Sequence, residues 1–368
     1  SGRSVRKSQD SHHKSTMISL PHRRRFLHLC ATGLGSATLP TLAEGQRPAS
    51  ESEKSPAELI TPEARTAIDR GLTFLTRKQV KSGKLAGAFG TSGYAAGTAV
   101  TGLGGLAFMC SGSVPGDGPY GSYVDACVDY LIRNTAESGY IAVPGGYDNM
   151  YGHGFATLFL SESYGVSQKP ELGEKLKKAV ALIVRCQNNQ GGWRYQPQKS
   201  DADLSITICQ IMALRAARDA GINVPDETRD KCIEYVKRSQ NSDGSFRYTL
   251  TGGSQGSFPL TAAGVVSLYS AGIYDGEQIE KGLKWLQRSS QTSGGSYYFY
   301  GQYYAVQAMW HAGGQYWDSW YPKIRDHLLK TQNGDGSWND AQVGAEFGTA
   351  MACIILQMPL NYVPVFSA

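Results

Sequence analysis

Two aspartates stand two positions apart near the middle of the chain, in the stretch DADLS at residues 201–205. Asp201 and Asp203 are followed by the apolar segment SITICQIMAL. Carboxyl groups held this close can raise one another's pKa, and a carboxyl that stays protonated in a dry pocket can donate a proton to a substrate. The alternative is structural, because Asp is a favoured N-cap residue and either side chain could cap the helix that follows.

Further polar and aromatic side chains gather in other short stretches that each precede an apolar segment, such as GGYDNMYGHG at 145–154 and YFYGQYY at 298–304. Tyrosine and phenylalanine rings in such stretches could stabilise a cation by their faces. Asp148 and His153 could pair as a general base and the group that orients it, or His153 could be a local cap or surface group. The candidate ligand-binding residues are Asp148, Tyr151, His153, Phe258, Phe299, Tyr300, Gln302, Tyr303 and Glu346.

A seven-residue pattern, Gln-x3-Gly-x-aromatic, recurs along the chain and indicates how these stretches are positioned. Clear copies are QNNQGGW at 187–193, QNSDGSF at 240–246, QTSGGSY at 291–297 and QNGDGSW at 332–338. Weaker copies run from Gln79 to Leu85 and from Asn134 to Tyr140. Successive copies begin 41 to 55 residues apart. A nearly constant period of this length predicts a repeat architecture, with six units filling residues 61–360.

Each unit has the same layout around its motif. Apolar residues before the Gln follow the spacing of one helix face, as in Leu176, Ala179, Val180 and Ile183. The glycine at position five is expected to end this helix in a left-handed cap. The segment after the motif is apolar on most faces, which predicts a buried second helix. Six helical hairpins result, and a closed ring is favoured over an open solenoid because neither end unit carries a polar capping helix.

The recurring Gln-x3-Gly-x-Trp motif, placed between an amphipathic and an apolar helix, resembles the QW repeats of squalene–hopene and oxidosqualene cyclases and the related protein prenyltransferase β subunits. The resemblance covers nearly all of residues 61–360. It implies an all-α fold, a single α/α toroid of six helical hairpins with an inner and an outer helix ring. In that family the Gln and the aromatic residue are structural, so we expect the functional site at the mouth where the inner helices begin.

Protonation-initiated terpene cyclases of this family carry Asp-x-Asp-Asp-Thr at the start of an inner helix. Asp201 and Asp203 match this motif, Leu204 replaces the last Asp, and Ser205 stands for Thr. The resemblance therefore implies Asp203 as the general acid, with Asp201 as its catalytic partner. The missing Asp and the room for only one toroid count against a full triterpene cyclase.

Three functions stay open, and whether the chain is an enzyme stays open with them. The preferred one is an exported cyclase- or prenyltransferase-like toroid that binds a ligand or has an uncharacterised activity at the cavity mouth. The alternatives are a protonation-initiated isoprenoid cyclase and a polysaccharide lyase-like toroid, to which Arg194, Lys199 and Arg247 could contribute basic groups. An apolar or isoprenoid molecule is the expected ligand, with a glycan as the alternative.

No metal and no cofactor is expected. The zinc set of the protein prenyltransferases, Asp-x-Cys with a distant His, has no counterpart, because Leu204 and Ser205 follow Asp203. Most of the cysteines after residue 100 lie in apolar helical patterns, which predicts small buried side chains. An oxidising compartment would permit disulfides, but the cysteine spacing requires none.

The N-terminal part of the chain differs from the rest in charge and composition. Most of the net charge of +5 comes from residues 1–60, so the body is near neutral and shows no basic stripe for nucleic acid. Arg23-Arg24 followed by Phe26-Leu27 resembles a twin-arginine export signal, which implies a periplasmic or extracellular protein that does not span a membrane. The predicted organisation is a signal and tail at 1–43, a linker at 44–60, the toroid at 61–360 and a tail at 361–368. The oligomeric state stays open.

Overall fold

The computed structural model describes residues 56–90, 97–143, 146, 148–253, 255–289, 295 and 297–367. Over these residues the chain forms twelve α-helices, three 3-10 helices and isolated bridges, and no β-sheet. The predicted all-α fold is confirmed. The twin-arginine pattern at Arg23 and the first residues of the fifth motif copy, Gln291 to Gly294, lie outside the described residues.

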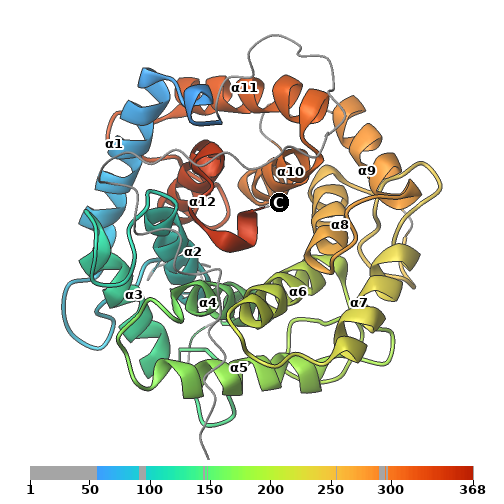
Figure 1. Cartoon of the computed structure of the whole chain (residues 1–368), viewed down its shortest axis with the longest axis horizontal. Coiled ribbons are helices and arrows are strands. Elements are labelled where there is room, and N and C mark those ends of the chain that lie inside the picture. The colour runs from blue at the N-terminus through green and yellow to red at the C-terminus, as the bar shows by residue number, and fades with distance from the viewer. Residues whose placement is uncertain are drawn as a thin grey trace, which may run out of the picture. The chain divides into compact units, whose positions relative to one another are not determined.

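Successive helices alternate between two concentric rings (Figure 1). The outer ring consists of α1 (Pro62–Lys78), α3 (Gly121–Arg133), α5 (Leu172–Cys186), α7 (Asp226–Arg238), α9 (Glu277–Arg288) and α11 (Gly314–Thr331). The inner ring consists of α2 (Gly97–Met109), α4 (Met150–Ser163), α6 (Leu204–Asp219), α8 (Phe258–Ser270), α10 (Tyr298–Ala312) and α12 (Ala345–Gln357).

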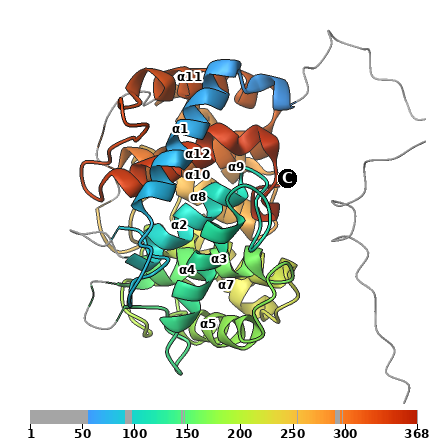
Figure 2. The same cartoon turned by 90° about the vertical axis from the view of Figure 1, so that its left-hand side faces the viewer.

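The two rings close on themselves, as predicted. Each inner helix packs against the next one, and α12 packs against both α2 and α1. Helices α11 and α5 lie on opposite sides of the ring in the end view and in the side view (Figure 2). The described residues therefore form a single α/α toroid of six helical hairpins.

Burial follows the expected difference between the rings. In α5 the buried side chains include Leu176, Ala179 and Ile183, which share one face, and the opposite face meets solvent. In α4, by contrast, every residue from 152 to 163 is buried. None of the described helices is long and apolar enough to cross a bilayer.

Short 3-10 helices extend the packed structure beyond both predicted toroid boundaries. The first, η2 (Pro56–Leu59), packs against η3 (Met358–Leu360). The last, η4 (Pro364–Phe366), packs on α6 and buries Phe366, which is 2% exposed. The boundaries predicted at residues 60 and 360 thus fall inside segments that pack on the ring.

The described repeat glutamines each join their own outer helix to the next one. The Gln187 amide nitrogen donates to Gly191 O within its own motif, at 2.9 Å, and to Thr228 O in α7, at 2.8 Å. Gln332 does the same with Gly336 O and with Ala67 O of α1, which links the last unit to the first. The predicted structural role of the glutamines is confirmed.

The motif tryptophans join the outer helix to the inner helix of the same unit. The Trp193 side chain is 1% exposed, and its indole nitrogen donates to Ile183 O of α5 at 2.7 Å. Its backbone N–H donates to Thr207 Oγ1 of α6 at 3.2 Å. Trp338 makes the equivalent pair of bonds in the last unit. The tryptophan at position seven therefore holds the hairpin together in these two units.

The prediction that the motif glycine ends the outer helix is wrong. Helix α5 ends at Cys186 with Gln187 as its C-cap, four residues before Gly191. Gly191 has φ 98° and lies in a turn in which its N–H donates to Asn188 O at 3.1 Å. A Cβ atom on it would stand 2.0 Å from Lys231 O in α7. The glycine is therefore required where the turn packs against the next outer helix.

The first motif copy has a different register from the one predicted. Gln79 donates to Gly87 O at 3.2 Å, and Phe89 N donates to Thr101 Oγ1 at 3.0 Å, as Trp193 N does to Thr207. Leu85, predicted to take the aromatic place, is 39% exposed. The loop is longer in this unit, so Phe89 occupies position seven.

The second copy is shifted by one residue. Thr135 forms an isolated bridge with Ile141, in the same way that Gln240 bridges to Phe246 in the fourth unit. Ile141 is fully buried, whereas the predicted Tyr140 is half-buried. Thr135 and Ile141 therefore replace the predicted Asn134 and Tyr140.

The cysteines behave as the apolar patterns predicted. The six cysteines within the described ranges, namely Cys110, Cys127, Cys186, Cys209, Cys232 and Cys353, are unpaired and buried. Burial raises the pKa of Cys209 to about 12, so this thiol stays protonated at neutral pH.

Candidate functional site at the start of the inner helices

Tyrosines of α10 cross the lumen of the inner ring. The Tyr300 hydroxyl donates to Ser205 O in α6 at 2.8 Å. The Tyr300 ring meets Tyr151 of α4 edge-on, with 6.2 Å between ring centroids. Helices α4 and α10 are not neighbours in the inner ring (Figure 1), so these contacts bridge its lumen near the ends where the helices begin.

Deeper inside the toroid, further aromatic side chains fill the lumen of the inner helix ring. Tyr303 meets Phe155 of α4 and Phe366 edge-on, with centroid distances of 6.0 and 6.1 Å. The Tyr304 hydroxyl lies 3.4 Å from Cys209 Sγ of α6. Burial raises the pKa of Tyr303 and Tyr304 well above the ordinary value, so both hydroxyls stay neutral. The centre of the ring is therefore occupied by the protein's own side chains.

Asp203 caps helix α6 with one carboxylate oxygen. Its Oδ1 accepts from Ile206 N at 2.9 Å and from Ser205 Oγ at 2.6 Å. Its Oδ2 has no hydrogen-bond partner within the described residues and lies 3.5 Å from Arg194 Nε. The carboxyl is fully buried, and burial raises the pKa of Asp203 even though its hydrogen bonds and Arg194 lower it. The capping alternative is confirmed for Oδ1. The predicted role as a general acid stays a prediction, and Oδ2 is the oxygen that would carry the proton.

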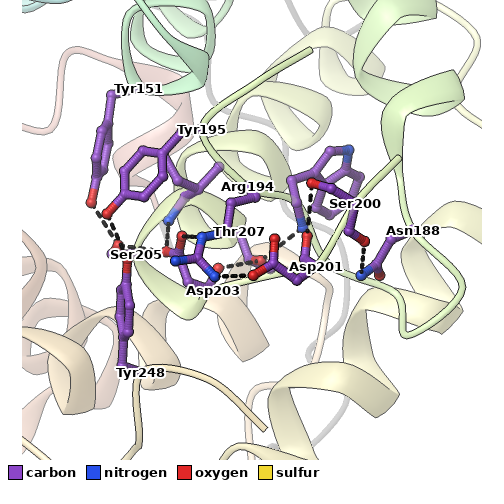
Figure 3. A network of polar contacts seen from close by, with 12 residues as sticks. Tyr151, Asn188, Arg194, Tyr195, Ser200, Asp201, Asp203, Ser205, Thr207 and Tyr248 are labelled. Carbon is purple, nitrogen blue, oxygen red and sulfur yellow. Dashed lines mark hydrogen bonds and ion pairs between the residues drawn. The ribbon is translucent and has the colours of Figure 1, made fainter. Parts of the chain in front are cut away.

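A chain of hydroxyls connects Asp203 to the lumen tyrosines. The Tyr151 hydroxyl donates to Ser205 Oγ at 2.6 Å, and Ser205 donates onward to Asp203. Figure 3 shows Tyr151, Tyr195 and Tyr248 converging near Ser205. The predicted residues Tyr151, Tyr300 and Asp203 are therefore brought together around one serine.

Arg194 stands beside this network in a cage of aromatic and acidic groups. Its guanidinium lies 5.4 Å from the Tyr195 ring centroid and 5.6 Å from that of Tyr248. Its Nη1 donates to Asp201 Oδ2, and the Tyr195 and Tyr248 hydroxyls lie 2.5 Å apart. Cation–π contacts and two carboxylates thus fix the position of this side chain (Figure 3).

A pocket of about 530 Å³ opens next to Arg194. It is lined by residues 188–190, Arg194, residues 199–202 and residues 249–252. Nine of these twelve residues have polar or charged side chains, the exceptions being Ala202, Leu250 and Gly252. Most residues that line the pocket therefore carry polar or charged side chains, and its size is within the range of small-ligand sites.

A second hollow, of about 620 Å³, lies on the outer ring beside α1. Two of its lining arginines bond to backbone oxygens of the last motif: Arg70 to Asn333 O and Gly334 O, and Arg77 to Asp335 O. These arginines join α1 to the last unit. This hollow therefore belongs to the contact that closes the ring.

Two predicted ligand contacts are engaged in local structure. Asp148 Oδ1 accepts from Thr98 Oγ1 at 2.7 Å, and its Oδ2 accepts from Val143 N at 2.6 Å. His153 is fully buried, with Nδ1 accepting from Ile141 N and Nε2 lying 3.2 Å from Ala179 O. Burial lowers the pKa of His153 to about 4, so the ring is neutral. His153 and Asp148 do not form the predicted pair, because each bonds to other groups.

The other predicted residues lie in the packed wall or at its edge. Phe258, Phe299 and Gln302 are 4%, 7% and 2% exposed. Glu346 is half-buried in the first turn of α12. Only Tyr151, Tyr300, Asp201 and Asp203 of the predicted set join the network around Ser205 and Arg194.

The sequence analysis missed Tyr195 and Tyr248 as site residues. Both follow a motif aromatic by two positions, in Trp193-Arg194-Tyr195 and in Phe246-Arg247-Tyr248. This repeated aromatic-Arg-Tyr spacing was a signal that could have found them. Across the described residues no group of three His, Cys, Asp or Glu side chains could hold a metal ion.

Comparison with known families agrees with this architecture. Residues 153–316 match the family model described as the prenyltransferase alpha-alpha toroid domain. The match spans 164 of the 368 residues, and this part of the chain is similar to the prenyltransferase toroid domain. The matched residues run from α4 to α11 and include Arg194, Asp203 and Tyr300, whereas Tyr151 lies just before them.

Solved structures share the toroid at low sequence identity. A protein from Actinoplanes is 14% identical with a TM-score of 0.58, over 81% of this chain and 99% of that one. The type II terpene cyclase MstE from Scytonema is 16% identical with a TM-score of 0.55, over 83% and 100%. A GH76 alpha-mannanase from Bacteroides thetaiotaomicron is 13% identical with a TM-score of 0.56, over 83% and 98%. No curated protein matches the sequence. At these identities the similarity concerns the fold.

Proposed function

We propose that this toroid binds a saccharide in the polar pocket beside Arg194. The observation that carries the proposal is the pocket lining, in which nine of twelve residues carry amide, hydroxyl or charged groups. Asn188 uses both atoms of its amide in bonds to the backbone, which leaves eight for a ligand. Such groups suit the hydroxyls of a sugar better than an isoprenoid chain, which needs a dry apolar cavity. The lumen, where an isoprenoid would be enclosed, is filled by Tyr300, Tyr303 and Tyr304. The alpha-mannanase with a similar fold is consistent with a sugar ligand on this scaffold.

The test is a glycan-array screen of the full chain beside a pocket variant, Gln190→Ala with Thr249→Ala. Both side chains line the pocket, and neither is buried. We expect a saccharide that the wild type retains and the variant loses by at least about tenfold in affinity. Thr66→Ala, in the hollow beside α1, is the matched control and should bind like the wild type. Equal glycan binding by the wild type and the pocket variant would refute the proposed site.

A second candidate function, acid-initiated cyclisation of an isoprenoid, rests on the buried Oδ2 of Asp203. This oxygen has no hydrogen-bond partner within the described residues, and burial raises the pKa of the carboxyl. One structure of the terpene cyclase MstE was determined with its substrate, geranylgeranyl dihydroxybenzoate. Arg194, at 3.5 Å from Oδ2, opposes this function because it favours the ionised carboxylate. Tyr300 would also have to leave the lumen for a substrate to reach Asp203.

The two candidates are separated by an Asp203→Asn variant. Asn is an equally good N-cap, so α6 should be retained while the acid is removed. Wild type and variant are incubated with geranylgeranyl dihydroxybenzoate, geranylgeranyl diphosphate and squalene, and products are analysed by mass spectrometry. Under the saccharide proposal neither protein forms a cyclised product. Turnover by the wild type that Asp203→Asn loses would instead establish the cyclase.

A further inference from the structure

The polar pocket presents more positive than negative charge. Arg194 and Lys199 line it, and Asp201 is the one carboxylate among its twelve lining residues. Asp203 also pairs with Arg194, but its side chain is fully buried behind the guanidinium. A pocket with two cations around one exposed carboxylate favours an anionic ligand.

Arg194 is already positioned to receive a carboxylate. The rings of Tyr195 and Tyr248 and the buried Asp203 hold its guanidinium in place, so binding would require little reorganisation. The planar guanidinium matches a carboxylate with two parallel hydrogen bonds. Within the described residues its one hydrogen bond goes to Asp201, whose side chain is 65% exposed.

The contact between Asp201 and Arg194 is the one that a ligand carboxylate can replace. An ion pair in contact with water contributes little to stability, because both charges can be solvated instead. Asp201 stands on a loop between the motif and α6, and the structure records no other hydrogen bond of its side chain. Asp201 can therefore leave Arg194 without disturbing the cap of α6, which Asp203 provides.

We propose that the pocket binds an acidic saccharide whose ring carboxylate replaces Asp201 on Arg194. The inference rests on the saccharide-binding function proposed above and names its ligand class. Lys199 is exposed and has no ion pair within the described residues, so it supplies a second contact to the anion. Gln190 and Thr249 face the same pocket and meet the sugar hydroxyls.

The inference is tested by titration calorimetry of the full chain with α-1,4-digalacturonate and with its neutral counterpart, α-1,4-galactobiose. We expect the acidic disaccharide to bind about tenfold more tightly, a difference of about 1.4 kcal/mol. The preference should shrink as salt is raised from 50 to 500 mM, because the deciding contacts are ionic.

Three variants distinguish carboxylate exchange from simple attraction. Asp201→Asn removes the competing carboxylate, so affinity for digalacturonate should rise several-fold while galactobiose is unaffected. Lys199→Gln, at an exposed position, and Arg194→Gln should each remove the acidic preference. Arg247→Gln is the matched control: Arg247 has the same repeat position as Arg194 but bonds to Arg238 O. This variant should bind like the wild type.

The outcomes separate this inference from the function on which it rests. Equal binding of both disaccharides, lost in Gln190→Ala with Thr249→Ala, would leave the saccharide site intact and overturn the acidic ligand class. Weaker digalacturonate binding by Asp201→Asn would overturn the exchange, because it would mean that Asp201 is needed to hold Arg194. If neither disaccharide binds and the glycan array is also blank, the saccharide function fails together with the inference.

Discussion

Gly191→Ala is expected to destabilise the toroid by about 2–5 kcal/mol, a large part of the total stability of an ordinary domain. Two effects add. A left-handed backbone conformation, here φ 98°, costs an alanine about 1–2 kcal/mol relative to glycine. The new Cβ would also stand 2.0 Å from Lys231 O and 2.6 Å from Lys231 C. Backbone atoms of α7 cannot rotate away, so the turn and α7 must separate, at a cost typical of overpacking, about 1–3 kcal/mol.

Gly221 provides a control that isolates the backbone effect. It follows α6 with φ 87°, and a Cβ atom there would meet nothing within 4 Å. Gly221→Ala should therefore cost only the conformational part, about 1–2 kcal/mol. Urea unfolding followed by circular dichroism measures both variants against the wild type. Equal losses in the free energy of unfolding for the two variants would show that the contact between the turn and α7 does not contribute to stability.

The same contact explains why the repeat could be recognised from sequence more readily than it could be aligned. Hairpins and helix faces follow from local hydrophobic periodicity, which each unit carries by itself. The register depends instead on which glycine touches the next outer helix. In the first unit this is Gly87, next to Ala126 O, and in the second it is Gly139, next to Lys178 O.

Counting from the first residue of each motif copy could not reveal those glycines. The first unit has a longer loop between Gln79 and its packing glycine, so the aromatic place moves to Phe89. In the second unit Thr135 takes the place of the glutamine, so the copy has no amide from which to count. Both errors in register arise because the feature that recurs is a contact between neighbouring units. The sequence of a single unit does not specify that contact.

The candidate site could be predicted only in part, because some of its contacts join helices that are far apart in the sequence. Asp203 as an N-cap follows from its place before an apolar helix, and the structure confirms it. The filling of the lumen does not follow from the sequence, because Tyr300 and Tyr303 reach helices on the far side of the ring. The sequence shows that these residues of α10 are aromatic, but it does not show that their side chains span the lumen of the inner ring.

Arg194 and Arg247 have the same local sequence pattern, but their side chains contact different groups. Both follow a motif aromatic and precede a tyrosine. Arg194 turns towards Asp201 and Asp203, whereas Arg247 donates to Arg238 O. The difference lies in the loop that follows, since the fourth unit caps its inner helix with Ser257 and offers no carboxylate there. The direction of each arginine is thus set by the loop that follows its motif.

His153 makes the wild type lose stability as the pH falls from 6.5 to 4, and His153→Thr should remove that loss. In the native state burial lowers the pKa of His153 from 6.5 to about 4. The unfolded chain therefore binds more protons than the native state within this window, so stability falls with falling pH. A difference of this size corresponds to about 3 kcal/mol at pH 4.

Threonine is the appropriate replacement because the repeat itself uses it. Thr101, Thr207, Thr261 and Thr349 accept a hydrogen bond from the motif backbone as His153 Nδ1 does from Ile141 N. The variant loses the contact with Ala179 O and some packing, so at pH 7 we expect it to be less stable by about 1–3 kcal/mol.

The decisive quantity is the slope of stability against pH, measured by urea unfolding of both proteins from pH 7 to pH 4. Burial also lowers the pKa of His311 to about 4, but His311 is present in both proteins and its contribution cancels in the difference. The stability curves should therefore converge as the pH falls, because only in the wild type does residue 153 take up a proton on unfolding. Parallel curves over this range would mean that His153 titrates normally and that the wall around it opens to water.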